Sequence, residues 1–292
     1  MEMKNLIIKK LKEMNKPIEQ TGDIWFRTTC LNPKHKDTKP SFHINLVTGI
    51  GACWSCGYKV TKDFWIKGII EDNEEIEREL KINELERKFL QKEEPQKETK
   101  IILPPHSEEV PYNYRGITLW KEVGAYICRK GKYKDRLIMP IYYDDKVKAF
   151  ETRALFDTPN KYMHSKGFSS KELIYPYNLL KESGSNYVVL VEGILDALSG
   201  WELGIPTITN WGVANNFNTN KIKELLKLGI DTIYLAFDKD QAGLLAQEKM
   251  LKDKLLNKYF EVKRGVELQK LKTFYTVFCK DLNDFLIKWK GV

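Results

Sequence analysis

The sequence contains no run of about 18 apolar residues, the length that a membrane-spanning helix needs. Its first residues, Met1 to Lys4, also lack the basic, apolar and small-residue segments of a secretory signal. Cysteine is scarce as well. The five cysteines are an odd number and are unevenly spread, which argues against a disulfide framework. These absences predict a protein of the cytoplasm that has no membrane partner.

Charge is unevenly distributed along the 292 residues. The formal net charge is +8, yet residues 71–100 hold 11 acidic and 7 basic side chains. Residues 129–171, in contrast, hold 11 Lys and Arg against 5 Asp and Glu. A basic stretch of this kind permits binding to a polyanion such as nucleic acid without establishing it. The hydrophobic content of 42% is enough for a core of ordinary size, in one large domain or two smaller ones.

Apolar patterning predicts how the chain is organised. We expect an amphipathic helix over residues 1–18 and a highly charged helix over residues 71–94, which ends at Pro95. The charged helix has too few apolar residues for a core of its own, so we interpret it as a spacer between two domains. After residue 101, strands alternate with helices, which predicts an α/β fold with a parallel sheet covered on both faces. The expected strands are 137–142, 148–152, 187–191, 207–209, 232–237 and 273–278, and the expected helices are 195–203, 221–228 and 242–256.

Three cysteines and one histidine form a metal-ligand pattern. The residues are Cys30, His35, Cys53 and Cys56. Four residues separate the first pair, 17 residues follow, and the last two cysteines form a Cys-x-x-Cys turn. Zinc favours tetrahedral sulfur and imidazole ligands, so the pattern predicts a closed structural zinc site. His43 is an alternative fourth ligand, although its alternation with its neighbours is typical of a strand. Cys128 and Cys279 are expected in hydrophobic cores.

Carboxylates follow two of the expected apolar strands. Glu192 comes directly after strand 187–191, and Asp238 and Asp240 come after strand 232–237. Residues two apart in an extended chain point to the same side, so the two aspartates are expected to converge. The carboxyl ends of parallel strands line the crevice where ligands bind, and carboxylates gathered there repel one another unless a cation lies among them. The sequence therefore predicts a site for Mg²⁺ or Mn²⁺.

A further acidic group follows the expected strand 273–278. By the same reasoning, Asp281 is a candidate for another contact to a metal, either direct or through water. Asp284 is interpreted as an acid in the first turn of a helix, where it complements the helix dipole.

Several motifs together resemble the DnaG-type primases of bacteria and phages. The motifs lie, in chain order, at residues 30–57, 115–118, 136–141, 150–153, 160–165, 191–193 and 237–243. The first resembles the zinc-binding module of these primases, the next four their basic subdomain, and the last two the TOPRIM fold that they share with topoisomerases. The resemblance implies an α/β fold (α+β overall) with four parts. These are a zinc-ribbon domain at 1–70, a charged helical linker at 71–105, a basic subdomain at 106–185 and a parallel-sheet TOPRIM domain at 186–292.

The resemblance also implies roles for single residues. The metal-binding acids are Glu192, Asp238 and Asp240, and further catalytic acids are Asp196 and Asp281. The residues that bind template and nucleotide phosphates are Arg136, Arg153, Lys161 and Lys171. Trp54 and Phe42 are candidate template contacts in the zinc module. Asn283 stands where the family usually has an aspartate.

The activity implied is that of a DNA primase, a nucleotidyltransferase that makes short RNA primers on single-stranded DNA for replication. Its cofactors would be structural Zn²⁺ and catalytic Mg²⁺ or Mn²⁺. Its partners would be single-stranded DNA, nucleoside triphosphates and a separately encoded replicative helicase. No helicase-binding domain follows the TOPRIM-like part, which favours a phage or mobile-element protein acting in a bacterial host cytoplasm. Two alternatives remain open: a TOPRIM nuclease or topoisomerase-like enzyme, and a non-catalytic adaptor that binds single-stranded DNA.

Overall fold

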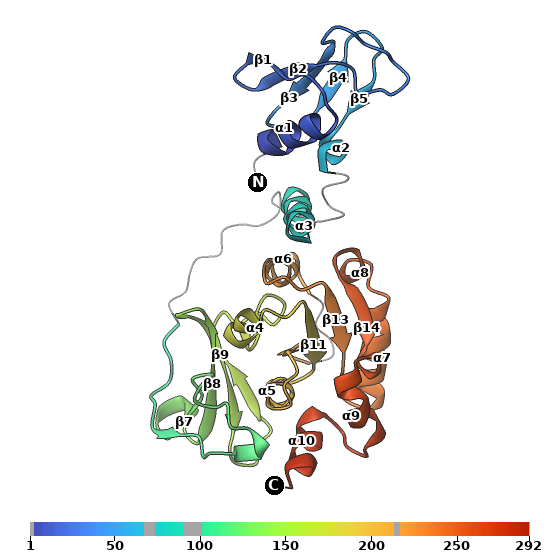
Figure 1. The fold of residues 1–292 in the computed structure, drawn as a ribbon. Coiled ribbons are helices and arrows are strands. Elements are labelled where there is room, and N and C mark those ends of the chain that lie inside the picture. Colours follow the sequence, from blue (N-terminus) through green and yellow to red (C-terminus); the bar gives the residue numbers. More distant parts are fainter. Residues whose placement is uncertain (1–2, 67–73, 90–100, 213–216, 292) are drawn as a thin grey trace. The chain divides into compact units, whose positions relative to one another are not determined.

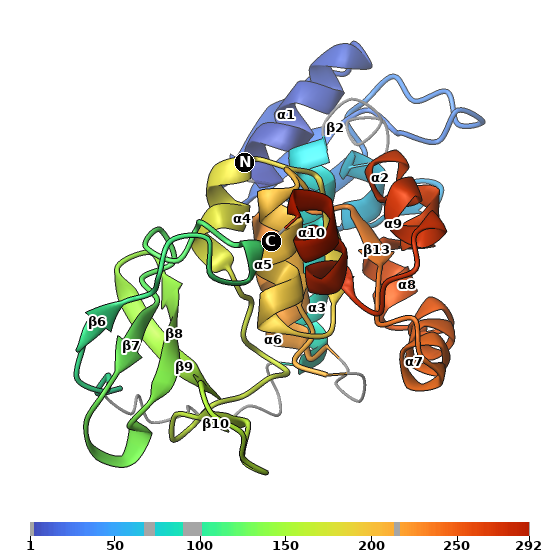
Figure 2. The ribbon, with the colours of Figure 1, turned by 90° about the horizontal axis from the view of Figure 1, so that it is seen from below.

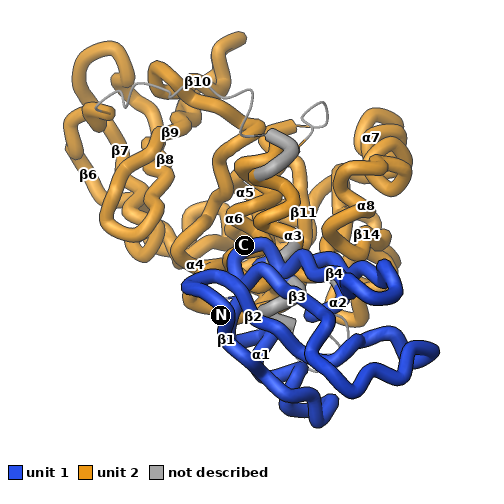
Figure 3. Tube along the Cα trace, turned by 90° about the horizontal axis from the view of Figure 1, so that it is seen from above, with its two compact units in different colours: residues 1–80 blue, residues 81–292 orange. Residues whose placement is uncertain are grey.

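The computed structural model describes residues 3–66, 74–89, 101–212 and 217–291. The chain forms two compact units, residues 1–80 and residues 81–292, and each is described by itself (Figure 3). Within the described residues, no helix is long and apolar enough to cross a membrane. The finer domain boundaries expected at residues 70, 105 and 185 stay predictions. Part of the expected linker, residues 90–100, lies outside the described residues.

The first unit contains a five-stranded antiparallel sheet and two helices (Figure 1). The strands pair in chain order: β1 (Glu19–Gly22), β2 (Trp25–Thr28), β3 (Phe42–Asn45), β4 (Gly51–Cys53) and β5 (Lys59–Val60). Helix α1 (Met3–Glu13) falls in the expected helical segment, and α2 (Lys62–Ile66) follows the sheet. Alternating burial along β3 places Phe42 and Ile44 in a core with Trp65. This small core fixes the strands from which the clustered cysteines extend.

Helix α3 (Glu74–Phe89) is the charged helix expected between the domains, and it contains residues of both units. Its Leu85 is 1% exposed and lies in a hydrophobic core of the second unit. Glu84 Oε1 also pairs with Lys258 Nζ at 2.5 Å. Both contacts lie within the second unit, to which the C-terminal part of α3 belongs.

The second unit contains an antiparallel sheet and a parallel sheet. The antiparallel sheet has the order β10-β9-β8-β7-β6, with β6 (Glu108–Glu109), β7 (Tyr126–Cys128), β8 (Arg136–Tyr143), β9 (Lys146–Ala154) and β10 (Tyr162–His164). The register of β9 and β10 places Glu151 opposite His164 and Arg153 opposite Tyr162. Because alternate residues of a strand share a face, Glu151 and Arg153 lie on the same side of this sheet.

The parallel sheet confirms the α/β prediction for the second unit. Its order is β12 (Thr207–Thr209), β11 (Tyr187–Val191), β13 (Thr232–Leu235) and β14 (Glu261–Arg264), and all three pairings are parallel. The helices of this unit after α3 are α4 (Tyr177–Ser183), α5 (Ile194–Glu202), α6 (Thr219–Lys227), α7 (Gln241–Leu251), α8 (Leu256–Tyr259), α9 (Lys272–Thr276) and α10 (Leu282–Lys290). Short 3₁₀ turns occupy residues 114–116, 131–133, 265–267 and 269–271. Figures 1 and 2 show α5 and α10 side by side. Cys128 and Cys279 are buried, as expected.

Two expectations for the C-terminal part are wrong. The expected strand at 273–278 is replaced by helix α9, whose buried Phe274 follows the buried Leu271 by three residues, a spacing typical of a helix. The fourth strand is instead β14, whose charged and partly exposed residues gave no strand pattern. The expected helix 242–256 is also interrupted. It ends at Leu251, and Asp253 then accepts hydrogen bonds from backbone N–H groups at the start of α8.

Candidate metal centre and candidate active site

Four side chains of the first unit converge next to strands β2 and β4. Cys30, His35, Cys53 and Cys56 each offer one ligand atom, and these atoms all lie within 4.8 Å of one another. Cys30 Sγ is 3.6 Å from Cys56 Sγ, and Cys53 Sγ is 3.7 Å from His35 Nδ1. The structure thus brings together the four residues that the sequence singled out. The group could hold a metal ion.

Hydrogen bonds favour the thiolate form of Cys53. Burial raises its pKa, but the Ser41 hydroxyl and backbone N–H groups outweigh burial and lower the pKa of Cys53 to about 6. Ser41 Oγ lies 3.1 Å from Cys53 Sγ and also contacts Asp37 Oδ2, so its one hydroxyl proton can be donated to only one of the two at a time. Since the thiolate is the form that binds metal ions, these contacts support a metal centre. His43, the alternative ligand, lies on β3 outside this group, and its ring stacks on Trp54 with 4.6 Å between ring centroids.

One cavity of the second unit, of about 440 Å³, is lined by Glu151 of β9 and by four carboxylates around the parallel sheet. These four are Glu192 after β11, Asp196 in the first turn of α5, Asp238 after β13 and Asp281 at the N-cap of α10. Asp240 does not line this cavity. Strand β13 ends at Leu235, so strand alternation does not orient residues 238–240, and the Asp240 side chain caps α7. Its Oδ1 accepts a hydrogen bond from Gly243 N at 2.9 Å.

Helix α7 begins directly against the segment that carries Asp238. A Cβ atom added at Gly243 would lie 2.2 Å from Asp238 O and 2.8 Å from Glu192 Oε1. Real Cβ contacts are never this short, so only glycine fits here without a shift of the backbone.

Backbone N–H groups orient three of the four acids. The pairs are Asp238 N to Glu192 Oε1 at 3.1 Å, Asn283 N to Asp196 Oδ1 at 3.0 Å, and Asp284 N to Asp281 Oδ1 at 2.7 Å. Each carboxylate has a second oxygen whose lone pairs can bind a ligand. The fourth acid, Asp238, pairs through Oδ2 with Lys280 Nζ at 3.1 Å. Asp284 lies in the first turn of α10, as expected.

The acids also raise one another's pKa. Burial and then Asp238 raise the pKa of Glu192 to about 7, and burial and then Asp281 raise the pKa of Asp196 to about 8. Burial raises the pKa of Asp238 as well, against the hydrogen bond from Lys280. A divalent cation would offset this repulsion, and carboxylate oxygens are the donors that Mg²⁺ prefers. The acids are less tightly gathered than the thiols: among described residues, only the Cys–His group has all its ligand atoms within 4.8 Å.

The antiparallel sheet contributes positive charge to the same cavity. Arg153 on β9 and Lys161 just before β10 both line it. The positive charge of nearby Arg153 is the largest cause of the lowered pKa of Lys161. Arg153 also donates a hydrogen bond to the Tyr162 hydroxyl. Guanidinium and ammonium groups placed in this way suit the binding of phosphate oxygens.

Two more cations line the cavity, and the sequence assigned no role to either. Arg115 has a φ of 57°, in the left-handed region, and its Nε donates to Asn283 Oδ1 at 2.9 Å. Asn283 is 2% exposed and also donates to Ser199 Oγ at 2.9 Å. Asn283 is thus a neutral hydrogen-bonding residue that holds Arg115. Lys280 is the second cation, and its position directly before Asp281 was the signal that could have identified it.

Arg136 and Lys171, expected to bind phosphates, do not line this cavity. Arg136 is 5% exposed, and its guanidinium donates to Asn160 O at 2.7 Å and to Lys161 O at 3.3 Å. It therefore supports the loop that carries Lys161. Lys171 is exposed and lines a separate hollow, together with His164, Phe168, Ser169, Ser170 and Trp211.

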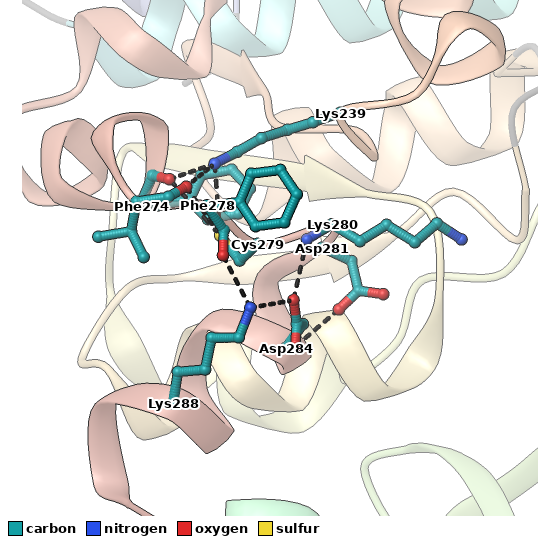
Figure 4. Close-up of polar contacts among 9 residues, drawn as sticks. Lys239, Phe274, Phe278, Cys279, Lys280, Asp281, Asp284 and Lys288 are labelled. Atoms are coloured by element: carbon teal, nitrogen blue, oxygen red, sulfur yellow. Dashed lines mark hydrogen bonds and ion pairs between the residues drawn. The ribbon is translucent and has the colours of Figure 1, made fainter.

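The segment between α9 and α10 is held from two sides (Figure 4). Lys239 points toward the segment that ends α9, and its Nζ donates to the backbone oxygens of Phe274 and Val277. Lys288 Nζ donates to Phe278 O at 2.7 Å. Both lysines bind main-chain oxygens, so they fix the backbone that leads into the acidic cavity.

Comparison with known protein families matches residues 189–286 to the Toprim-like family model. Two curated relatives are both DNA primases. The primase of Thermotoga maritima is 32% identical over 139 residues, which cover 45% of this chain and 24% of the relative. The primase of Campylobacter jejuni is 22% identical over 277 residues, which cover 74% of this chain and 45% of the relative. The chain thus spans less than half the length of either relative.

Residues 189–286 form a Toprim-like domain, as the sequence predicted. The predicted resemblance to DNA primases is confirmed by both curated relatives. Among solved structures, the zinc-binding and RNA polymerase domains of the Aquifex aeolicus primase match 100% of this chain and 80% of that chain, at 18% identity and a TM-score of 0.45.

Proposed function

We propose that this chain is a DNA primase, a nucleotidyltransferase that joins ribonucleotides on single-stranded DNA. The observation that carries the proposal is one cavity in which four carboxylates of the Toprim-like domain lie together with Arg153 and Lys161. Carboxylates suit divalent metal ions, and the two cations suit phosphates. Primer synthesis needs both, because the nucleoside triphosphate and the departing pyrophosphate are polyanions. The proposed partner is a separately encoded replicative helicase.

In the proposed reaction, a 3′-hydroxyl attacks an α-phosphorus and pyrophosphate leaves. Mg²⁺ or Mn²⁺ held by these acids would lower the pKa of the attacking hydroxyl and neutralise the charge that develops on the leaving group. Glu192 and Asp238 are the proposed main ligands, with Asp196 and Asp281 as further acids. Asp240 caps α7, and we propose it as an additional metal contact.

We propose that the Cys–His group of the first unit holds structural Zn²⁺. Four protein ligands leave no coordination position for a substrate, so this metal would stabilise the fold. Trp54 is 79% exposed and stacks on His43, so the outer face of its indole is a proposed stacking surface for a template base. Phe42, expected as a second template contact, is fully buried in the core of this unit, and that expectation is wrong.

The direct test of the function is incorporation of labelled ribonucleotides on pools of single-stranded DNA, with and without Mg²⁺ or Mn²⁺. Short RNA products are expected only when template, nucleotides and metal are all present. DNA shortening that needs no nucleotides would support the TOPRIM nuclease instead. DNA binding with neither activity would support the adaptor. Either of these results would overturn the proposed function.

The two arginines of the predicted phosphate-binding set are expected to behave differently. Arg153→Ala should weaken binding of single-stranded DNA or nucleotide by about tenfold and flatten its salt dependence, because a phosphate contact is lost. Arg136→Ala should instead lower the free energy of unfolding by about 1–3 kcal/mol, because the carbonyl groups of Asn160 and Lys161 lose a charged donor that is itself buried. Fluorescence anisotropy at several salt concentrations and urea denaturation separate the two effects. Equal flattening of the salt dependence in both variants would show that Arg136 does contact phosphate.

A further inference from the structure

One carboxylate of the cavity lies on the same strand, β9, as Arg153. Among the described residues that line the cavity, Glu151 is the one acid contributed by the antiparallel sheet. It is 6% exposed, and it shares a face of β9 with Arg153. A buried carboxylate next to a proposed phosphate site is unfavourable for phosphate binding unless another residue neutralises it.

Glu151 is paired with a histidine across the sheet. The residue opposite it on β10 is His164, and His164 Nε2 lies 2.8 Å from Glu151 Oε2. The side chains differ in exposure: 8% for Glu151 and 42% for His164. The Nε2 edge of the imidazole is therefore held against the buried Glu151, and the Nδ1 edge is left to bind a ligand. Within the described residues, no hydrogen-bond partner of His164 Nδ1 is present.

Aromatic contacts fix the plane of the imidazole. The His164 ring stacks on Phe168 with 4.0 Å between centroids and 26° between planes. Phe168 in turn meets Trp211 edge to face, with centroids 4.9 Å apart. His164 and Trp211 both line the cavity. The ring is therefore oriented by a hydrogen bond at one nitrogen and by stacking on its face.

Glu151 offers this ring a hydrogen-bond acceptor and a negative charge. Burial raises the pKa of Glu151, while His164 and then Arg153 oppose the shift. Glu151 also acts on Tyr162 from β10 and Tyr175 from the segment before α4, and burial raises the pKa of both tyrosines. Lys171 lines a hollow together with His164. Neither tyrosine supplies a positive charge. A carboxylate in contact with imidazole stabilises imidazolium, and imidazole is the side chain that takes up its proton between about pH 5 and pH 8.

We propose that Glu151 is a positioning residue that holds His164 as a cationic contact for the phosphates of the nucleotide substrate. This inference rests on the proposed function, since it assumes that nucleotides bind in this cavity. His164 contacts the phosphates, and Glu151 acts through His164. A protonated His164 would add one positive charge to those of Arg115, Arg153, Lys161 and Lys280, which line the same cavity.

The test is calorimetric binding of ATP with Mg²⁺ between about pH 6 and pH 8.5, where imidazole changes its charge. Glu151→Gln keeps the shape and the hydrogen bond but removes the negative charge, so ATP affinity near neutral pH should fall by about tenfold, the scale of one charge-assisted contact. The loss should shrink toward the acidic end, because the ring then takes up its proton without help. His164→Gln should lose affinity and should lack the additional gain at low pH. ATP itself takes up a proton in this range, so wild type and variants are compared at each pH.

The chain offers a matched control. His106 Nε2 and Glu109 Oε1 form a similar pair at 3.2 Å, with both side chains exposed and neither in the cavity. Glu109→Gln should therefore leave ATP binding unchanged at every pH. In the double variant of Glu151 and His164, the second substitution should add no further loss, because both residues act as one unit.

The outcomes separate the inference from the proposed function. Equal loss of ATP affinity in Glu151→Gln at all pH values, or additive losses in the double variant, would overturn the positioning role. A wild-type protein that makes RNA but shows the same pH dependence as His164→Gln would overturn this inference alone. A wild-type protein that binds no nucleotide would overturn the proposed function as well. Because His164 is partly exposed, His164→Gln should fold even if Glu151→Gln does not, and its pH profile alone then decides.

Discussion

Asp238→Ala is expected to abolish RNA synthesis while leaving binding of single-stranded DNA nearly unchanged. Asp238 lines the cavity after β13, and its proposed role is to hold the catalytic metal ion. Its loss should reduce nucleotide incorporation by roughly a thousandfold, the scale on which single electrostatic groups contribute to catalysis. Removing a negative charge also reduces repulsion toward the DNA backbone, so affinity for DNA should not fall. Nucleotide incorporation and fluorescence anisotropy measure the two effects.

Two companion variants make this experiment specific. Asp157→Ala removes an exposed aspartate that does not line the cavity, and it should keep full activity. Asp240→Asn keeps an N-cap of nearly equal strength on α7 but removes the charge. Loss of incorporation in this variant with unchanged stability would support Asp240 as a metal contact. If Asp238→Ala made RNA as fast as wild type, Asp238 would have no catalytic role and its proposed role as a metal ligand would be wrong.

Cys53→Ser is expected to release bound zinc and to unfold the first unit. The wild-type protein should hold close to one zinc ion per chain, because one described group has the four thiol and imidazole ligands. In small zinc modules, metal binding supplies about 10–16 kcal/mol of apparent free energy that stabilises the fold. The core of this unit is small, so it should not stay folded without the metal. Metal analysis and limited proteolysis of residues 3–66 measure the two outcomes.

The control for this experiment is another buried cysteine. Cys279→Ala changes a thiol of the second unit, far along the chain from the metal ligands, and should retain zinc. Wild-type protein that holds no zinc after careful preparation would contradict the proposed metal centre. A Cys53→Ser variant that loses zinc but resists protease would show that the first unit folds without metal.

The parts of the fold that could be predicted are those with two buried faces. Strand β11 is almost wholly apolar and strand β12 is buried along its length, and the structure places both at the predicted residues. Strand β14 is partly exposed and carries charged residues, so it has no apolar signal to find. Helix α9 has a strand-like composition of aromatic and β-branched residues, and only its contacts reveal a helical face. Where tertiary packing decides whether a segment forms a helix or a strand, the intrinsic preference of its residues predicts the structure poorly.

The residues of the candidate site could also be predicted only in part. The acids Glu192 and Asp238 could be located because the ends of parallel strands meet at one edge of a sheet. The partners of the basic residues could not be predicted. Arg136 is buried against main-chain carbonyls while Arg153 lines the cavity, and nothing in the local sequence distinguishes the two. The pair of Glu151 and His164 depends on the register of two strands, which a single sequence does not specify.

The close approach of α7 to the acids affects how genetic screens of this protein would be interpreted. Gly243 offers no functional group, yet any side chain there would displace the backbone of Asp238 and the carboxylate of Glu192. In a selection that scores activity alone, Gly243 variants would be grouped with catalytic residues. The start of α7 sets the spacing between Asp238 and Glu192. That spacing is possible because Gly243 has no side chain. A loss-of-function map would therefore mark residues that shape the site, such as Gly243, as well as residues that carry out its chemistry.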